Sequence, residues 1–291
     1  RDRARALVKI QDGCDRFCSY CIIPFTRGPV RSRKLENIKE EVGRIVKNGY
    51  KEVVLTGIHV ASYGKDSGDM SLIDVIESIA EIEGLERIRT SSVEPLIITE
   101  EFVQRLGAVD KFCPHFHLSL QSGSDSVLSR MNRRYTSQEY REAVNTIRRT
   151  FPYAAITTDV IVGFPEETDQ EFEQTYEFLK ELKLYETHIF KYSPRNGTKA
   201  AEMPDQVDPS VKNSRSECLI KLNEKNKKDF EDLHVGQIVD ILIETHENGY
   251  ATGHTKNYIK AGIKTQENLS NQIIKSRITD ISEDFAIAER A

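Results

Sequence analysis

The run LVKIQDGCDRFCSYC, residues 7–21, places a strand-like segment immediately before three closely spaced cysteines. Leu7–Gln11 is short and largely aliphatic, and Cys14 falls just after it. Beyond this run, strand-like and helix-like segments alternate through residue 192, which is the pattern that produces parallel β/α architecture. The sequence therefore predicts an α/β fold whose first strand ends at the cysteines.

The alternation contains six predicted strands and five predicted helices. The strands are short and several are β-branched, as expected for strands buried on both faces: Leu7–Gln11, Glu52–Gly57, Arg87–Ser91, His115–Leu120, Ala155–Val162 and Glu186–Tyr192. The helices carry apolar residues at three- and four-residue spacing, and Thr99, Ser137 and Thr168 are predicted N-caps: Glu36–Lys47, Leu72–Ile82, Glu100–Leu106, Ser137–Arg149 and Asp169–Leu182. Five crossover helices between six parallel strands predict a partial (βα)6 barrel, with its chemistry at the carboxyl ends of the strands.

The pattern changes in the last third of the chain. Residues 196–209 are rich in Gly, Pro and polar residues, and residues 210–233 form a long, highly charged helical pattern. Short alternating segments punctuated by glycine follow: Gln237–Glu244, Tyr250–His254, Tyr258–Lys264, Gln272–Ile281 and Phe285–Ala288. We therefore expect a core domain (1–209), a connecting helix (210–233) and a small antiparallel β-barrel of the oligonucleotide-binding kind (234–291).

Composition narrows the class of protein. Hydrophobic residues make up 38% of the 291 positions and charged residues 30%, as in a soluble globular protein, and no apolar run reaches the roughly 20 residues that a membrane span requires. Three of the five cysteines lie within eight positions, which favours a metal site in a reducing cytoplasm over a disulfide framework. The chain begins with Arg1 and no apolar signal segment, so we expect that an upstream part is missing.

The charge is acidic overall and basic near the cysteines. The net charge is −5, whereas residues 1–34 hold nine Lys or Arg and three Asp. A basic rim around a metal site suits an anionic polymer, and Arg27, Arg31 and Arg33 are the candidate RNA contacts in it. A solvated charged surface is the alternative interpretation.

The spacing C-x3-C-x2-C, formed by Cys14, Cys18 and Cys21, puts three thiolates on one tight loop, where they can converge on one iron–sulfur cluster. Three protein ligands leave one iron of a four-iron cluster open, which is typical of a reactive site. The alternative is a structural zinc site completed by His59 or another histidine. The second C-x2-C pair of a zinc knuckle is absent from the sequence.

The longer stretch QDGCDRFCSYCIIPFTRGPVRSR, residues 11–33, resembles the radical S-adenosylmethionine (SAM) methylthiotransferases, and the resemblance covers essentially all 291 residues. It is most similar to the branch that modifies N6-threonylcarbamoyladenosine at position 37, beside the tRNA anticodon; relatives act on isopentenyl-adenosine or on a ribosomal protein. The resemblance implies a radical SAM core followed by a TRAM domain. It also implies a [4Fe–4S] cluster on Cys14, Cys18 and Cys21, with SAM as second cofactor.

In this family one electron from the cluster cleaves SAM, and the adenosyl radical removes hydrogen from C2 of the adenine. Sulfur comes from a second [4Fe–4S] cluster held by an N-terminal domain, and we expect the sequence beginning at Arg1 to lack that domain. The resemblance therefore implies the catalytic core and RNA-binding tail of a truncated enzyme, which cleaves SAM without inserting sulfur. Its implied partners are the tRNA anticodon stem-loop and a low-potential electron donor.

The resemblance also assigns SAM contacts near the strand ends. Gly57 lies in a TGIH turn, and the resemblance implies that backbone carbonyls of this turn contact the methionyl amino group of SAM. Glycine suits this position because it lets the backbone approach a ligand closely. For Glu94 the resemblance implies a carboxylate that accepts hydrogen bonds from the ribose or the amine of SAM. For Gln121 and Ser122, in a QSGS motif, it implies a side-chain amide that can donate and accept hydrogen bonds beside small residues. Turns and a solvent-facing acid are the structural alternatives.

Four further residues complete this expected SAM site. Arg133 is expected to hold the cofactor carboxylate or an RNA phosphate, with helix-end charge as the alternative. Ile161 and Gly163 match the adenine-contacting segment of the family, although Glu166 stands where the family often has glycine. Tyr20 is expected to lie against the adenine, with a buried core tyrosine as the competing explanation.

The carboxyl-terminal barrel gives a mixed signal for RNA. Residues 231–291 hold six Lys or Arg and ten Asp or Glu. RNA contact is therefore expected only on a local face with Lys256, Tyr258, Lys260 and Lys264. An acidic barrel would also suit a basic protein substrate, and a non-catalytic zinc-stabilised RNA-binding protein is the alternative of another class. The remaining cysteines and the other histidines are expected to be structural: Cys113, Cys218, His188, His234, His246 and His254.

Overall fold

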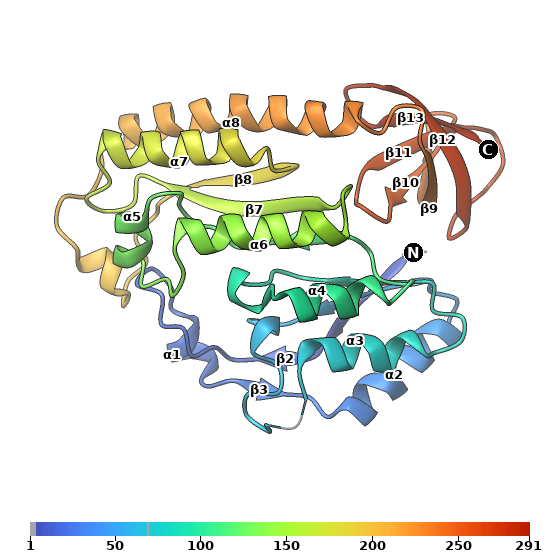
Figure 1. Cartoon of the computed structure of the whole chain (residues 1–291), viewed down its shortest axis with the longest axis horizontal. Helices are drawn as coiled ribbons and strands as arrows, with labels where there is room; N and C mark the ends of the chain where they lie inside the picture. Colours follow the sequence, from blue (N-terminus) through green and yellow to red (C-terminus); the bar gives the residue numbers. More distant parts are fainter. Residues whose placement is uncertain (1–3, 69) are drawn as a thin grey trace.

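The computed structural model describes residues 4–68 and 70–291; Arg1 and Arg3 of the basic amino-terminal segment lie outside the described residues. Parallel strands and flanking helices alternate as the sequence predicts, and helices cover one face of the curved sheet (Figure 1). The strands are β1 (Arg5–Lys9), β4 (Glu52–Thr56), β5 (Arg87–Thr90), β6 (His115–His117), β7 (Ala155–Val162) and β8 (Glu186–Lys191). This confirms the partial barrel.

The strands of this barrel fall into two halves. β1, β4 and β5 form one parallel sheet, and β6, β7 and β8 form another. Isolated parallel bridges, Ile88 with Phe112 and Val93 with Leu118, connect the halves. The predicted strand His115–Leu120 is therefore too long. Continuous pairing ends at His117, and beyond it only isolated bridges form, at Leu118 and Gln121.

The crossover helices follow the predicted ranges closely and bury their apolar faces in one core. They are α2 (Leu35–Lys47), α3 (Leu72–Ala80), α4 (Glu100–Gly107), α6 (Ser137–Thr150) and α7 (Asp169–Leu182). Thr99 and Thr168 accept hydrogen bonds from the third residue of α4 and α7, as predicted for N-caps. The predicted cap Ser137 is wrong by one residue, because Thr136 forms a reciprocal capping box with Glu139.

Short elements not predicted from the sequence surround the carboxyl ends of the strands. The first strand begins and ends two residues earlier than predicted, and the chain then turns into β2 (Gln11–Asp12), which pairs antiparallel with β3 (Arg31–Ser32) on either side of the cysteine loop. Helix α1 (Ile23–Arg27) lies between them. The other short elements are η1 (Val60–Ser62), η2 (Pro95–Ile97), α5 (Asp125–Arg130) and η3 (Lys199–Glu202).

The long helix α8 (Pro209–Asp232) packs along the larger domain instead of standing free between two domains (Figure 1). Leu219 and Leu222 belong to the main core, and the Asn223 side chain accepts a 2.6 Å hydrogen bond from the backbone of Thr187 on β8. The helix expected as a connector therefore also covers one side of the partial barrel.

The carboxyl-terminal strands form the predicted small barrel, closed in the order β10-β11-β13-β12-β9. Their bounds are β9 (Ile238–Glu247), β10 (Tyr250–Thr255), β11 (Lys260–Lys264), β12 (Ile273–Ile281) and β13 (Ala286–Arg290). One pair, β11 with β13, is parallel, whereas the other pairs are antiparallel as expected. Among the described residues, the structure contains no helix with the length and apolarity needed to cross a bilayer.

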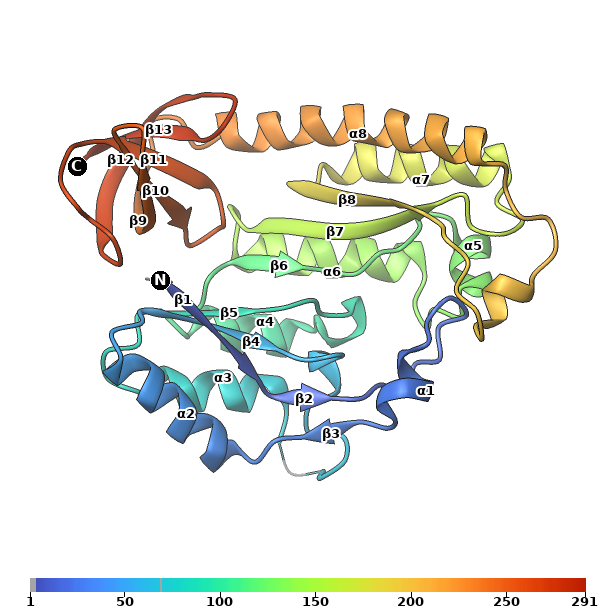
Figure 2. The same ribbon diagram turned by 180° about the vertical axis from the view of Figure 1, so that it is seen from behind.

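The small barrel lies at the end of the core opposite α1, close to the start of β1 (Figure 2). Arg87 and Arg89 of β5 are buried, and both donate hydrogen bonds to backbone carbonyls of the small barrel. Because Ile88 between them packs in the helix-covered core, both arginines point to the other face of the sheet. We call that other face the inner face of the partial barrel.

Candidate functional site

The cysteine loop is held in place by backbone hydrogen bonds. The amide of Cys14 donates to Gly28 O at 3.0 Å, and the amide of Cys21 donates to Cys18 O at 2.9 Å. The Asn132 side chain donates to Phe17 O at 2.8 Å and joins the loop to the segment after α5. These contacts bring the three predicted ligands, Cys14, Cys18 and Cys21, into one loop as free, half-buried thiols.

The thiols share one local environment. Burial raises the pKa of Cys14 and of Cys21, and the charges of the neighbouring cysteines raise both further. Because the negative charges of crowded thiolates repel one another, a bound cation that displaces the thiol protons would relieve that repulsion. The donor set therefore fits an iron–sulfur cluster with three thiolate ligands.

Glu94 lies beside this loop, after β5, and is buried among positive groups. His59 Nε2 and Arg16 Nη2 lie 3.1 and 2.6 Å from its Oε2, and Arg133 Nη2 lies 3.3 Å from Oε1. Burial favours the neutral acid, yet His59 and the charges of Arg133 and Arg16 lower the pKa of Glu94 to about 2. Glu94 is therefore a carboxylate at neutral pH.

Arg133 connects Glu94 to the cysteine loop. Its Nη1 donates to Cys18 Sγ at 3.3 Å, and its Nε donates to Tyr135 Oη at 2.9 Å. Burial opposes its charge, but Tyr135, Tyr20, Cys18 and Glu94 raise its pKa. A permanent positive charge therefore lies against one of the expected cluster ligands, and such contacts tune cluster potentials.

Several buried polar atoms around Glu94 lack an aligned hydrogen-bond partner in the described structure. They are Glu94 Oε2, His59 Nε2 and Arg133 Nη2, whose ion-pair distances are short but whose hydrogen-bond geometry is poor. Buried polar groups normally find partners, so this arrangement fits a zwitterionic ligand that supplies both donors and acceptors. SAM, with its amino and carboxylate groups, has that chemistry.

A cavity of about 530 Å³ opens beside the cysteines, between their loop, α5 and η3. Its lining includes Cys18, Cys21, Phe17, Phe25 and Arg130. A larger hollow of about 950 Å³ lies away from the cysteines, near α6, α7 and α8, and most of its lining is charged or polar. Of these two hollows only the first contains cluster ligands, and neither is lined by Glu94, Arg133 or Gln121 of the expected SAM site.

Tyr20, Gln121 and Ile161 of the expected SAM site lie near the strand ends. Gln121 is buried at φ 72°, and its backbone pairs with β7 through Asp159 O and Ile161 N. Tyr20 and Ile161 pack against the same small apolar cluster, in which the rings of Tyr20 and Phe164 meet edge to face at 6.4 Å.

Three other expected SAM contacts have local structural reasons. A Cβ at Gly57 would lie 2.8 Å from Gln11 Oε1, and a Cβ at Gly163, where φ is +67°, would lie 2.3 Å from Lys212 Cγ. The Ser122 hydroxyl lies 3.2 Å from Thr175 Oγ1 on α7. The two glycines are thus required by packing, and the Ser122 hydroxyl is used within the fold.

The expected RNA contacts near the cysteines differ in their solvent exposure and in their ion pairs. Arg27 and Arg31 are exposed, and Arg31 lies 3.6 Å from Asp12. Arg33 is half-buried and pairs with Glu41 at 2.6 Å. Arg27 and Arg31 are therefore the better candidates for phosphate contact on this side.

The expected RNA face of the small barrel is divided. The Tyr258 ring stacks on His115 and His254, at centroid distances of 4.3 and 4.7 Å, and Lys256 Nζ donates to Asp110 O at 2.7 Å. Both residues therefore belong to the interface with the core domain, and RNA contact by Tyr258 and Lys256 stays a prediction. Lys260 and Lys264 are exposed on the barrel, which lies at the opposite end of the molecule from α1 (Figure 2).

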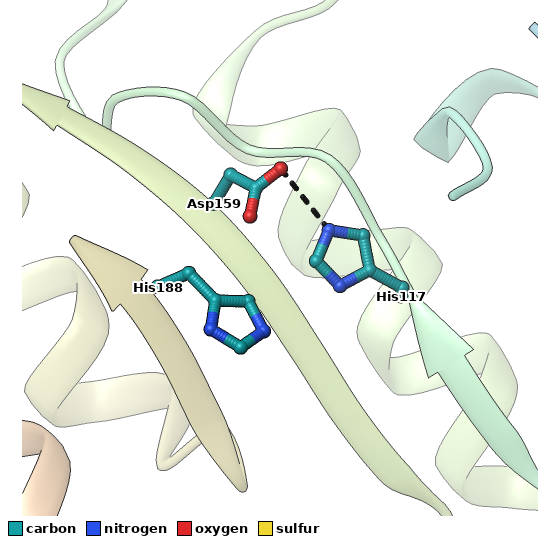
Figure 3. Close-up of side chains that lie close together, drawn as sticks. All are labelled: His117, Asp159 and His188. Atoms are coloured by element: carbon teal, nitrogen blue, oxygen red, sulfur yellow. Dashed lines mark ion pairs between the residues drawn. The ribbon is translucent and has the colours of Figure 1, made fainter. Parts of the chain in front are cut away.

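Sequence reasoning missed a second polar group on the inner face. His117, Asp159 and His188 come from three neighbouring strand segments and point toward one another (Figure 3). Arg16 and His59, which contact Glu94, were also not assigned to the SAM site. The available signal was the alternation of side chains between the two faces of a strand. His115 and His117 flank the buried Phe116, so both lie on the opposite face from it.

Comparisons with known proteins agree with this geometry. Residues 8–179 match the model of the radical SAM superfamily. Over 283 residues the chain is 43% identical to the threonylcarbamoyladenosine tRNA methylthiotransferase MtaB of Bacillus subtilis, covering 95% of this chain and 63% of that protein. It is 42% identical over 245 residues to the tRNA-2-methylthio-N(6)-dimethylallyladenosine synthase of Pelotomaculum thermopropionicum, covering 84% and 55%. The chain thus spans less than two thirds of these relatives.

Among solved structures, the chain resembles the radical SAM methyltransferase TsrM of Kitasatospora setae, with a TM-score of 0.56 and 16% identity. The match covers 67% of this chain and 38% of that one. At this identity the likeness concerns the fold alone, and it supports the partial barrel.

Proposed function

Because this chain belongs to the radical SAM superfamily, and its relatives within it are methylthiotransferases, we propose that it carries the SAM-cleaving core of a tRNA methylthiotransferase. The single observation that supports this most strongly is the joining of the three-cysteine loop to Glu94 by Arg133. That arrangement provides three thiol ligands and, beside them, a buried charged cradle with unmatched polar atoms.

In this proposal Cys14, Cys18 and Cys21 hold the cluster, which supplies the one-electron reduction that cleaves SAM. Glu94 accepts hydrogen bonds from the cofactor, and its ionised state is maintained by His59 and Arg16. Arg133 donates toward Cys18 and keeps its charge beside that ligand. Tyr20, Gln121 and Ile161 border the same region and contribute apolar and backbone surface for the adenosine.

The proposed substrate is N6-threonylcarbamoyladenosine at position 37 of tRNA. The 43% identity to the Bacillus protein of that name supports it, although a dimethylallyladenosine enzyme is 42% identical over a shorter stretch. Arg27, Arg31 and Lys260 are the proposed phosphate contacts, and their separation would place RNA along the length of the molecule. The anticodon stem-loop, a low-potential electron donor, a second cluster in the whole protein and a cytoplasmic location belong to the same proposal.

Anaerobic reconstitution with iron and sulfide tests the core of this proposal. We expect about four irons per chain, iron–sulfur absorption, and 5′-deoxyadenosine when SAM and dithionite are added. Ala at Cys14, Cys18 or Cys21 should abolish all three readouts, whereas Cys218→Ala, on α8, is the matched control and should leave them unchanged. Stoichiometric zinc without iron–sulfur absorption would falsify the proposal.

The substrate is tested separately by mass spectrometry of tRNA nucleosides from cells lacking the gene. We expect the methylthiolated form of N6-threonylcarbamoyladenosine to disappear and its unmodified precursor to accumulate. Loss of the dimethylallyl derivative instead would move the assignment to the other relative. Unchanged methylthiolated adenosines would remove tRNA as the substrate.

A further inference from the structure

The inner face of the partial barrel holds a cluster of metal-ligating side chains outside the cysteine loop. His117 ends β6, Asp159 lies within β7, and His188 lies within β8, directly opposite Asp159 in the strand register. Ile189, next to His188, packs against the helix-covered core, so His188 faces the inner side. The three side chains converge there (Figure 3).

The distances among these side chains fit a shared cation. One potential ligand atom from each residue lies within 4.8 Å of the other two. His117 Nε2 and Asp159 Oδ2 are 3.2 Å apart. Two ligands bound at about 2.1 Å with bond angles near 100° are separated by about this distance, whereas a direct charged hydrogen bond is typically nearer 2.7–2.9 Å.

A residue behind His117 holds its ring in position. Thr157 Oγ1 lies 3.0 Å from His117 Nδ1 and 3.2 Å from His115 Nε2. Because Nδ1 is engaged with Thr157, Nε2 is the nitrogen directed at Asp159. Histidine ligands in metal sites commonly have such a partner on the second ring nitrogen, since it fixes the ring orientation.

The third side chain is free to adjust. The His188 ring lies 5.6 Å from the His117 ring, with 24° between the planes, and it is exposed on the inner face. Asp159 is partly exposed, with 30% of its side chain accessible. A cation and its outer ligands can therefore enter from the inner face without rearrangement of the backbone.

We propose that His117, Asp159 and His188 form a binding site for a zinc-type divalent cation. Two imidazoles and one carboxylate favour Zn²⁺ or Co²⁺ over Mg²⁺ and Ca²⁺, which prefer oxygen ligands. Three protein ligands leave a fourth position open to water or to an oxygen atom of a substrate, as in catalytic zinc sites. The site differs in chemistry from the cysteine loop, whose thiolates suit iron.

The position of this site relates it to the expected SAM site. The backbone amide of Gln121 donates to Asp159 O at 2.8 Å, so the cation site lies one step toward the amino end of β7 from the Gln121–Val160 bridge. An anionic oxygen bound at the open position of the cation would therefore lie close to Gln121, which we expect to contact SAM. The proposal itself rests on the three ligands and stands whether or not the chain modifies tRNA.

The test uses the full chain with Cys14, Cys18 and Cys21 replaced by Ala, so that the thiols do not compete for metal. Zn²⁺ is titrated by equilibrium dialysis with metal analysis, and Co²⁺ by its visible absorption. We expect one tightly bound ion per chain and a Co²⁺ spectrum with nitrogen and oxygen ligands. His188→Ala and Asp159→Asn should each weaken binding at least about tenfold, and Thr157→Val by roughly ten- to a hundredfold.

The control is His246→Ala, in the small barrel, where the ring contacts Thr265 O; it should bind like the parent. Because His188 is exposed, its replacement should leave the fold intact, which circular dichroism verifies. Absence of a bound ion in the parent, or equal affinity in the parent and in His188→Ala, would overturn the proposal. Equal loss in His246→Ala would also overturn it, since binding would then be nonspecific.

Discussion

Replacing Tyr258 by Ala should loosen the small barrel from the core domain. The ring stacks on His115 and His254, and the guanidinium groups of Arg89 and Arg5 lie 4.8 and 5.4 Å from its centroid. Ring pairs contribute about 0.5–1.5 kcal/mol each and cation–π contacts about 0.5–1 kcal/mol each. We therefore expect Tyr258→Ala to lower the free energy of unfolding by about 2–5 kcal/mol.

The loss is measured by urea unfolding followed by circular dichroism, since the chain has no tryptophan. Hydrogen exchange adds a local readout, because backbone amides of the small barrel that lie near its contact with the core domain would exchange faster if the barrel loosened. Tyr258→Phe is the matched control; it keeps the ring and should cost under about 1 kcal/mol. An unchanged stability in Tyr258→Ala, combined with weaker RNA binding, would refute this reasoning and support Tyr258 as an RNA contact.

Three other predictions concern single substitutions. The folded-state pKa of Glu94, about 2, lies below its ordinary value of 4.5, so its ionisation stabilises the fold above pH 4.5 and this contribution is lost as pH falls toward 2. Glu94→Gln should therefore lower stability by up to about 3 kcal/mol at pH 7, and the difference from wild type in thermal unfolding should shrink steadily in acid; a constant difference would contradict this. Gly163→Ala should cost about 1–3 kcal/mol, because its positive φ and the side chain of Lys212 oppose a Cβ, whereas Glu166→Gly, at φ 64°, should be neutral or slightly stabilising in the same unfolding assay.

The order of strands and helices could be predicted because each element carries a local signal. Apolar spacing identified the helices, and β-branched runs identified the buried strands. The errors are local as well: Ser137 was chosen as a cap although the Thr136–Glu139 pair satisfies more backbone donors. The break after β6 was not predicted, because it depends on pairing between distant segments and not on the composition of residues 118–120.

The site was predictable where its residues are adjacent in sequence and less so where they are not. The cysteine loop is one short motif. By contrast, His117, Asp159 and His188 are separated by tens of positions, and only the strand register brings them together. Tyr258 was assigned to RNA as part of a local face with three lysines, and its stacking on His115 of the core domain depends on a domain contact that the sequence does not reveal.

The hydrogen bonds of Arg87 and Arg89 have a consequence for modularity. Both guanidinium groups extend from β5, are buried and donate to carbonyls of the small barrel: Arg87 to His254 O and Asp240 O, and Arg89 to Lys256 O and Thr255 O. Arg89 Nε also donates to Glu52 Oε1 of the core domain at 3.1 Å. Exchanging the small barrel for another would leave the terminal nitrogens of both guanidinium groups without these carbonyl acceptors, unless the new barrel presents carbonyls at the same places. We therefore expect the two domains to change together, as one inherited unit, and not to be freely recombined.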